Sequence, residues 1–414
     1  MPEAAVAGER ALRLLPASAT PEAGLLLTTR GLRAFGDGLV SLLLPVYLVG
    51  RGFGAVEVGA IATATLAGSS LLTLLVGLHA HRFPARGVLL GAALLMALTG
   101  AAFALVDGFW PLLLVAFVGT LNPSAGDVSL FLPLEQAWLA HTAADRDRTA
   151  LFARYSLVGS LAGALGALAA GLPQLLGGVL PGGLGTALEA AFLLYATLGL
   201  ASFLLYRRLP PEAPDPAAPP RPLGKSRRTV LRLAALFSVD AFAGGLVVQS
   251  LLALWLLERF GLSLATTGAI FFWSGLLSAA SYLAAVPLAR RVGLVNTMVF
   301  THLPANVCLV LVPFAPNLAM AIILLLVRSA LSQMDVPTRT SYVMAVVEPA
   351  ERAAAASVTA VPRGLAAAAS PLLAGWLLAS SGFGWPLVAG GGLKIAYDLA
   401  LLAMFRKVRP PEER

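Results

Sequence analysis

The chain has 414 residues, of which 58% are hydrophobic and only 12% are charged. Soluble globular proteins carry about 25% charged residues, so this composition excludes a soluble domain and predicts an all-α protein that crosses a membrane many times. The formal net charge of +8 is explained by basic residues on the cytoplasmic face of a membrane. We therefore expect a lipid bilayer, and no nucleic acid, as a partner.

The cysteine and histidine content excludes the common metal sites. Cys308 is the single cysteine, and His79, His81, His141 and His302 lack the spacing of metal ligands. The sequence also lacks the G-x-x-x-x-G-K-[ST] loop that binds ATP. We expect no metal, no cofactor and no enzymatic activity.

Charge-free runs and turn residues divide the chain into twelve expected spans. The tail at 1–24 precedes them and has no apolar core of a signal peptide. The expected spans are 25–49, 57–78, 87–106, 110–139, 150–173, 187–206, 231–257, 263–289, 293–313, 317–345, 354–379 and 385–405.

The first span carries two ionisable residues, Arg33 and Asp37, which are four positions apart and so share a helix face. A charge at membrane depth is costly unless it faces protein or a water-filled cavity, which makes Asp37 a candidate functional residue. The alternative is that Arg33 and Asp37 only neutralise each other and orient the helix.

Basic residues alternate between the two sets of loops. The loops after even-numbered spans hold most of them, including Arg82, Arg290 and Arg352, whereas the opposite loops hold only Arg51 and Arg259. The positive-inside rule then places both termini in the cytoplasm. The Ala-, Gly- and Arg-rich composition suggests a prokaryotic inner (plasma) membrane.

The spans form two groups. We expect an N-terminal six-helix bundle at 25–206, a basic, Pro-rich cytoplasmic linker at 207–229, a C-terminal six-helix bundle at 230–405 and a cytoplasmic tail at 406–414. Such a linker is extended and semi-rigid.

The two groups repeat each other. Ala34-Phe35 corresponds to Ala241-Phe242, an offset of 241 − 34 = 207, and Trp138 and Arg148 correspond to Tyr342 and Arg352, an offset of 352 − 148 = 204. A nearly constant offset over the whole half indicates a duplication. Because six spans return the chain to the side on which it started, the repeat is parallel.

Twelve spans, cytoplasmic ends and a 6+6 duplication with a linker at mid-chain resemble the major facilitator superfamily of transporters over essentially the whole chain. The family's signature loop, G-x-x-x-D-R-x-G-R-[RK], corresponds to residues 77–86, where Gly77, Arg82 and Arg86 match but His81 replaces the acid and Pro84 the inner Gly. The resemblance implies a gate at the cytoplasmic face. Its candidate residues are Gly77, His81, Arg82, Arg86, Glu135, Arg148, Arg290, Arg291, Arg339 and Arg352.

The resemblance also implies a central cavity lined mostly by spans one, four, seven and ten. Counting about 1.5 Å per residue along each helix places Asp37, Arg328 and Arg363 near the midplane. Arg328 and Arg363 have no opposite charge one turn away, so they need a partner across the cavity. The candidate cavity residues are Arg33, Asn122, Asp240, Gln249, Arg328, Asp335 and Arg363.

Three further groups have simpler interpretations. Asp335 with Arg339, and Lys394 with Asp398, stand four residues apart and are expected to pair within their own helices. The glycines of span five and the segment 370–375 at the end of span eleven are interpreted as packing residues at the hinge between the halves, with antiport only suggested. His302 and Asn306 on span nine are interpreted as kink and packing residues.

The first functional interpretation is a monomeric secondary transporter that exports a small organic molecule in exchange for protons. Asp37 is the first candidate for the proton-coupling acid and Asp127 the second. The alternative is an importer of an organic anion or zwitterion, by proton symport or uniport, with Arg328 and Arg363 holding the substrate. A sensor or a lipid-handling protein on the same fold is a lower-ranked alternative.

Overall fold

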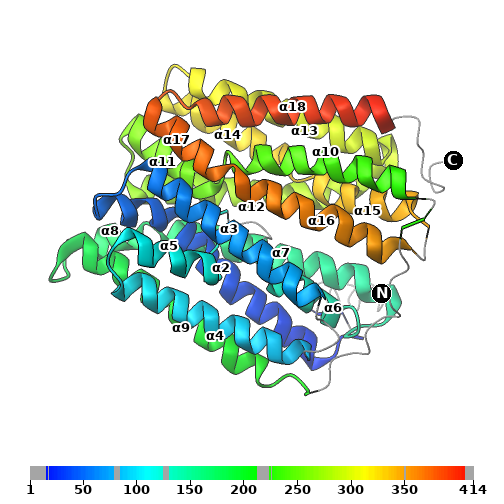
Figure 1. Cartoon of the computed structure of the whole chain (residues 1–414), viewed down its shortest axis with the longest axis horizontal. Coiled ribbons are helices and arrows are strands. Elements are labelled where there is room, and N and C mark those ends of the chain that lie inside the picture. The colour runs from blue at the N-terminus through cyan, green and yellow to red at the C-terminus, as the bar shows by residue number, and fades with distance from the viewer. Residues whose placement is uncertain are drawn as a thin grey trace, which may run out of the picture.

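The structure is a computed structural model that describes residues 15–16, 18–78, 84–124, 130–211, 223–224, 226–348 and 351–405. The described part of the chain folds into helices that run side by side along one long axis (Figure 1). The first half comprises α2 (Pro21–Gly50), α3 (Ala55–Leu78), α4 (Ala85–Leu105), α5 (Phe109–Val118), α6 (Phe131–Leu139), α7 (Asp145–Ala169), α8 (Leu172–Leu176) and α9 (Gly183–Tyr206).

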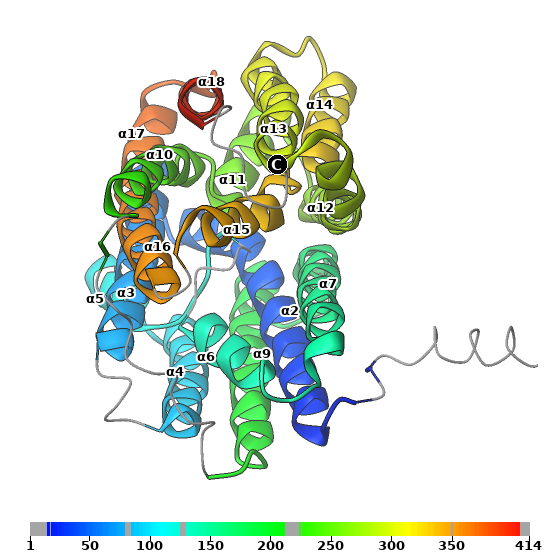
Figure 2. The same ribbon diagram turned by 90° about the vertical axis from the view of Figure 1, so that its right-hand side faces the viewer.

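The second half repeats this arrangement. It comprises α10 (Arg227–Gly245), α11 (Gln249–Phe260), α12 (Leu264–Val292), α13 (Leu294–Leu311), the 3-10 turn η1 (Val312–Phe314), α14 (Leu318–Ser332), α15 (Asp335–Val346), α16 (Arg352–Ala369), α17 (Pro371–Ser380) and α18 (Trp385–Phe405). Figure 2 looks along the helices and shows the two halves as separate groups.

Eleven stretches of the described residues are long and apolar enough to cross a membrane. The expected fourth span, 110–139, is instead two short helices, α5 and α6. Pro123 has no backbone N–H to donate, and the Asn122 side chain accepts hydrogen bonds from Ser124, which is the chemistry of a turn. The all-helical fold of the prediction is confirmed, whereas the count of twelve spans stays a prediction.

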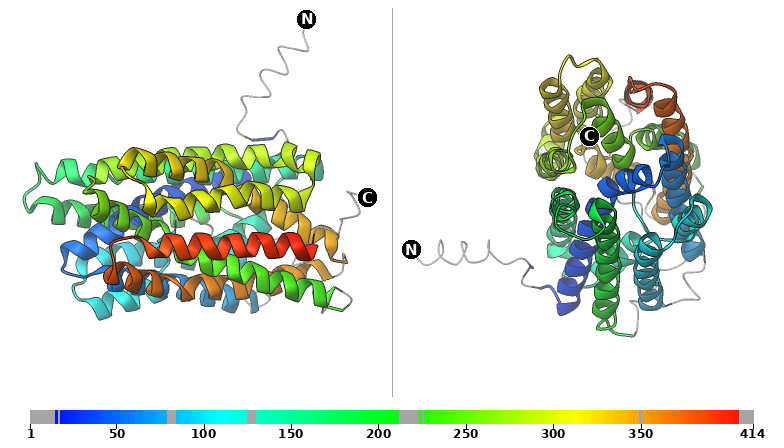
Figure 3. Two further views of the ribbon diagram at one scale, coloured as in Figure 1. Left: turned by 90° about the horizontal axis from the view of Figure 1, so that it is seen from above. Right: turned by 90° about the vertical axis from the view of Figure 1, so that its left-hand side faces the viewer.

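We call the end of the bundle at residues 207–211 and 223–226, where the chain passes between the halves, the connection end. The opposite end, with the turns at 51–54, 261–263 and 381–384, is the far end. Figure 3 shows the far end in its right-hand view, with the blue end of α2 lying between the two halves.

The buried apolar residues form three clusters, and their distribution shows where the halves meet. One cluster contains residues of both halves, from Leu39 and Tyr47 on α2 to Leu251 on α11 and Ala374 on α17. The second cluster lies wholly within the first half and the third wholly within the second half. The halves therefore share a core toward the far end and have separate cores toward the connection end.

Small residues allow the halves to touch at the far end. A Cβ added to Gly375 of α17 would lie 2.3 Å from the carbonyl oxygen of Ala55, and one on Gly268 of α12 would lie 2.6 Å from that of Ala167. Direct hydrogen bonds cross the same region: Gln249 Nε2 donates to Ser41 Oγ at 3.0 Å, and the Leu372 N–H donates to Thr63 Oγ1 at 2.9 Å.

Within the first half, the glycines of α7 bring it against α2. A Cβ on Gly166 would lie 2.0 Å from the Phe35 carbonyl oxygen, and one on Gly38 would lie 2.0 Å from that of Gly163. Close helix packing, one of the two interpretations of the span-five glycines, therefore accounts for Gly163 and Gly166.

Candidate functional site

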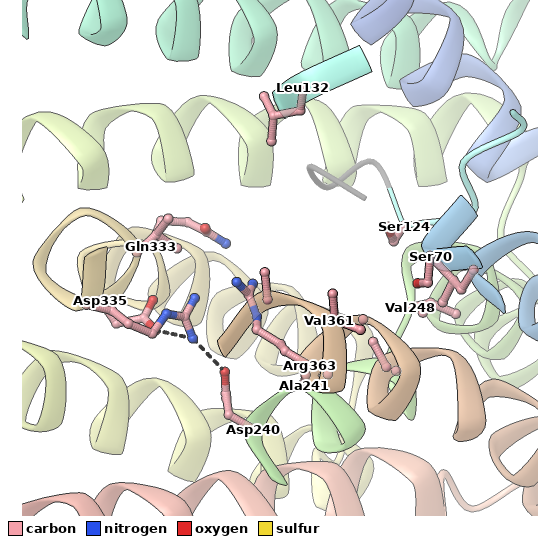
Figure 4. A pocket seen from close by; sticks show the side chains of 18 of the residues that line it. Ser70, Ser124, Leu132, Asp240, Ala241, Val248, Gln333, Asp335, Val361 and Arg363 are labelled. Carbon is pink, nitrogen blue, oxygen red and sulfur yellow. Dashed lines mark hydrogen bonds and ion pairs between the residues drawn. The ribbon is translucent and has the colours of Figure 1, made fainter. Parts of the chain in front are cut away.

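A cavity of about 500 Å³ lies between the halves. Its walls come from α3 and α6 of the first half and from α10, α13, α14, α15, α16 and α18 of the second half (Figure 4). The turn between α5 and α6, the turn after α10 and the turn between α14 and α15 contribute Ser124, Val248 and Gln333 to this lining. Helix breaks at membrane depth are tolerated where they border a cavity. The position of these breaks at the cavity wall therefore accounts for their occurrence inside the bundle.

The two walls differ in charge. The described residues of the first-half wall are all uncharged: Leu66, Ser70, Thr73, Leu74, Ser124, Leu132, Pro133 and Gln136. The ionisable residues of the second-half wall are Asp240, His302, Arg328, Asp335, Arg339, Arg363 and Lys394. Counting four Lys or Arg against two Asp gives 4 − 2 = +2 before His302 is considered.

Four of these residues form what we call the cavity ion cluster: Asp240, Asp335, Arg339 and Lys394. Asp240 accepts from Lys394 Nζ at 2.5 Å and from Arg339 Nη1 at 3.0 Å. Arg339 Nη1 also lies 3.5 Å from Asp335 Oδ2. The cluster is buried and carries no net charge, which offsets the large cost of removing each ion from water.

The other two arginines have no such counter-charge. Among the described residues, no Asp or Glu oxygen lies within ion-pair distance of Arg328 or Arg363. Arg363 extends from α16 into the cavity beside the cluster (Figure 4). The Nε of Arg328 is buried and has no hydrogen-bond partner. These two guanidinium groups supply the net positive charge of the cavity.

A polar triad lies beside the cluster. Asp398 of α18 is fully buried and lies 2.9 Å from His302 Nδ1, and it also accepts a 2.9 Å hydrogen bond from Asn306 Nδ2. His302 reaches the cavity, whereas Asp398 lies behind it and is absent from the cavity lining.

The first half has a counterpart of the Asp240–Arg339 pair with the charges exchanged. Arg33 of α2 forms an ion pair with Glu135 of α6. The repeat relates Arg33 to Asp240 (240 − 33 = 207) and Glu135 to Arg339 (339 − 135 = 204). Glu135 also accepts hydrogen bonds from the side chains of Thr29, Tyr155 and Tyr206. Arg33 and Glu135 are only 2% and 0% exposed, so this pair is sealed inside its half.

These contacts correct one expected pair. Lys394 was expected to pair with Asp398 but binds Asp240. Neutralisation of Arg33 by Asp37 was one of two interpretations of the first span, and the ion pair that Arg33 forms is with Glu135. The physical reason is that packed helices lie 8–10 Å apart, so a long side chain reaches a neighbouring helix as easily as the next turn of its own. The expected Asp335–Arg339 pair is present and is extended by Asp240.

The structure places four of the candidate cavity residues, Asp240, Arg328, Asp335 and Arg363, around one cavity. It does not place Arg33, Asn122 or Gln249 in the lining: Arg33 is sealed with Glu135, Asn122 forms a turn and Gln249 joins the halves. Sequence reasoning missed Lys394 and His302 as cavity residues.

Of the proton-coupling candidates, Asp37 is half-buried on α2, in hydrogen-bond contact with Tyr195 and outside the cavity lining. Asp127 lies outside the described residues.

The gate candidates are dispersed. Gly77, Arg290 and Arg291 are exposed near the connection ends of α3 and α12. Arg86 donates to the Arg207 carbonyl and Arg148 to the Ala140 carbonyl, both within the first half. Glu135 and Arg339, expected at the gate, lie in buried ion pairs inside their own halves, since each has its counter-charge there.

The structure does not describe the remaining gate candidates. His81 and Arg82 lie outside the described residues, as does the side chain of Arg352. The gating roles stay predictions.

One family model matches both halves of the chain. The sequence model of the Major Facilitator Superfamily matches residues 26–327 and 233–414. The uncharacterized membrane protein YJR124C of Saccharomyces cerevisiae is 26% identical over 413 residues, covering 90% of this chain and 92% of that protein.

Solved structures show the same fold. A variant of the nucleoside transporter NupG has a TM-score of 0.74 at 15% identity, covering 92% of this chain and 99% of that one. A D-xylose–proton symporter has a TM-score of 0.73 at 15% sequence identity, and the match covers 95% of this chain and 99% of that one. The third structure is a bacterial homolog to the human lysosomal transporter Spinster in an inward-facing and occupied conformation. Its TM-score is 0.75 at 14% sequence identity, and the match covers 94% of this chain and 97% of that one.

Proposed function

The chain belongs to the Major Facilitator Superfamily, and from this premise of secondary transport we propose that its substrate is a small organic anion bound in the central cavity. The observation that carries the proposal is the pair of cavity arginines, Arg328 and Arg363, which have no carboxylate within ion-pair distance among the described residues. Guanidinium groups bind carboxylates and phosphates through paired, charge-assisted hydrogen bonds.

The opposite wall suits the remainder of such a substrate. Leu66 and Leu132 offer apolar surface, while Ser70, Thr73 and Gln136 offer uncharged hydrogen-bonding groups. The volume of about 500 Å³ lies within the usual range of small-molecule sites. One wall would thus hold the acid group and the other the organic part.

Alternating access follows from where the halves meet. The shared core and the glycine contacts lie toward the far end, and the cores separate toward the connection end. Together with the positive-inside prediction, this supports a cavity that is closed to the outside and accessible from the cytoplasm. Separation of the far-end contacts would expose the same arginines to the other side.

The first functional interpretation, proton-coupled export, rested partly on the glycines of span five. Gly159, Gly163 and Gly166 pack α7 against α2, and Gly171 lies against Ala265 of α12, so these glycines are accounted for by packing and carry no information about direction. Export stays a prediction, and anion transport is preferred because it uses charges that line the cavity. Proton coupling is part of the proposal, through a site considered below.

The test is equilibrium binding to the purified full chain in detergent. The probes are a panel of mono- and dicarboxylates, with a neutral sugar and a nucleoside for comparison. Charged hydrogen bonds contribute about 1.5–3 kcal/mol, so Arg363→Gln and Arg328→Gln are each expected to weaken carboxylate binding by about 10- to 100-fold.

Arg259→Gln is the matched control, because Arg259 is exposed at the end of α11 and away from the cavity. It should leave the affinity unchanged. Binding of the neutral probes alone, or carboxylate binding that survives both cavity substitutions, would refute the anion proposal.

A further inference from the structure

The His302–Asp398 pair has a geometry that substrate binding alone does not explain. His302 Nδ1 and Asp398 Oδ1 are 2.9 Å apart across the interface of α13 and α18, and both residues are buried. Asn306 donates to the second oxygen of Asp398 at 2.9 Å. Both oxygens of Asp398 are therefore held by buried polar side chains.

The charged side chains around the pair already have ion-pair partners of their own. Lys394, one turn from Asp398 on α18, binds Asp240 of α10, and Arg339 of α15 binds Asp240 and Asp335. Tyr397 of α18 faces the imidazole with ring centroids 6.2 Å apart and is uncharged as a phenol. Among the described residues, His302 is the one group within 4.0 Å of Asp398 that can supply a positive charge.

A carboxylate buried at membrane depth without a counter-charge costs several kcal/mol. A charged Asp398 beside a neutral His302 would be such a group. The pair is therefore neutral overall only when it holds one additional proton. The pair can hold that proton at His302 Nδ1, which lies against the carboxylate. It has a route to solvent because His302 lines the cavity, whereas Asp398 is sealed behind it.

We propose that the His302–Asp398 pair is the proton-binding site of this transporter, filled from the cavity and occupied by one proton in the conformation seen here. Its use in transport rests on the proposed function, but the occupancy of the site does not. The site replaces Asp37, which lies outside the cavity lining in the other half of the molecule.

Lys394 couples the loss of the proton to the charge that the cavity presents to the substrate. If the proton leaves, Asp398 keeps an uncompensated negative charge, and Lys394 on the same helix is close enough to turn toward it. Asp240 then loses one of its two cations, and the positive charge around the cavity falls by one. An anion in the cavity is consequently held less tightly, so proton and anion bind together, which is the requirement for symport.

The test uses the proton alone as the probe. The full chain is labelled with ¹⁵N-histidine, and nitrogen NMR distinguishes the doubly protonated imidazolium from the neutral ring. The chain has four histidines, so the His302→Gln spectrum identifies the signal of His302. We expect an imidazolium signal near neutral pH in the wild type that is absent from His302→Gln and is lost as the pH is raised.

Asp398→Asn should convert His302 to the neutral ring at the same pH. Asp107→Asn, which removes an exposed carboxylate that pairs with Arg51 at the far end, is the control and should leave the signal in place. A His302 ring that is neutral throughout the wild-type titration would overturn the proposal. That result needs only the assignment from His302→Gln, so it decides the question even if Asp398→Asn fails to fold.

A second measurement separates this inference from the proposed function. Carboxylate affinity in the wild type should fall as the His302 imidazolium is lost, and His302→Gln should abolish that pH dependence. If no carboxylate binds but the imidazolium is present, the proton site stands and the substrate class is wrong. If carboxylates bind with the same pH dependence in His302→Gln, the coupling through this site is wrong.

Discussion

At the scale of single residues, the partner of a buried charge is decided between helices. Spacing along the chain suggested that Arg33 pairs with Asp37 and Lys394 with Asp398, because spacing reports only neighbours on one helix. The structure joins Arg33 to Glu135 and Lys394 to Asp240. The repeat contained a usable signal: the offsets of 207 and 204 already relate Arg33 to Asp240 and Glu135 to Arg339.

The sealed first-half pair predicts a large loss of stability. Glu135→Gln keeps the side-chain shape but leaves Arg33, only 2% exposed, without its counter-charge. Breaking a buried ion pair by removing one partner costs about 3–5 kcal/mol. We expect a decrease of this size in the free energy of unfolding, measured by denaturant titration in mixed micelles.

The control is Glu189→Gln, which removes a carboxylate that is 42% exposed and lies 3.2 Å from Arg51. Exposed ion pairs contribute about 1 kcal/mol or less, so this change should be small. Equal effects of the two substitutions would show that Glu135 is not the counter-charge on which Arg33 depends.

At the scale of elements, the existence of the helices followed from apolar runs, but their breaks did not. The expected spans at 110–139, 231–257, 317–345 and 354–379 are each divided into two helices. Hydropathy cannot report such breaks, because the turn residues Val248 and Met334 are themselves apolar. The breaks border the cavity or find a specific partner, as where Ser370 Oγ donates to the Phe242 carbonyl at 2.6 Å.

The contact of α3 with α17 predicts a change of conformation. Gly375→Ala places a methyl group 2.3 Å from the Ala55 carbonyl oxygen, too close for any atom, so α17 must move away from α3. We expect the far end to open. The measurement is the distance distribution between spin labels on Val49 and Ser380, in a Cys308→Ala background, which should shift to longer values.

Gly382→Ala is the matched control, because a Cβ there meets nothing within 4 Å. It should leave the distribution unchanged. A Gly375→Ala distribution identical to that of the wild type would show that this contact does not hold the far end closed.

At the scale of the whole molecule, the duplication was predicted from offsets in the sequence, but the division of charge between the halves was not. Candidate cavity residues were expected on both halves, including Arg33 and Asn122. In the structure every charged residue of the described cavity lining belongs to the second half. The halves share a fold, but only the second presents charge to the substrate.

The orientation of the whole molecule is also testable. Basic residues in alternate loops predict that the chain ends face the cytoplasm and the far end faces outward. A fluorescent protein that matures only in the cytoplasm should fluoresce when fused after Arg414, and alkaline phosphatase should be active when inserted after Leu180. The reverse pattern in bacterial cells would invert the assignment of the cavity opening.

The exchanged signs of the two equivalent ion pairs also limit which single substitutions the fold can accept. Arg33–Glu135 and Asp240–Arg339 occupy corresponding places with opposite polarity. Replacing Arg33 by the Asp of the other half would bury two carboxylates side by side, and replacing Asp240 by Arg would bury two guanidinium groups side by side, which the membrane penalises heavily. The halves are therefore equivalent in backbone position but not interchangeable one residue at a time.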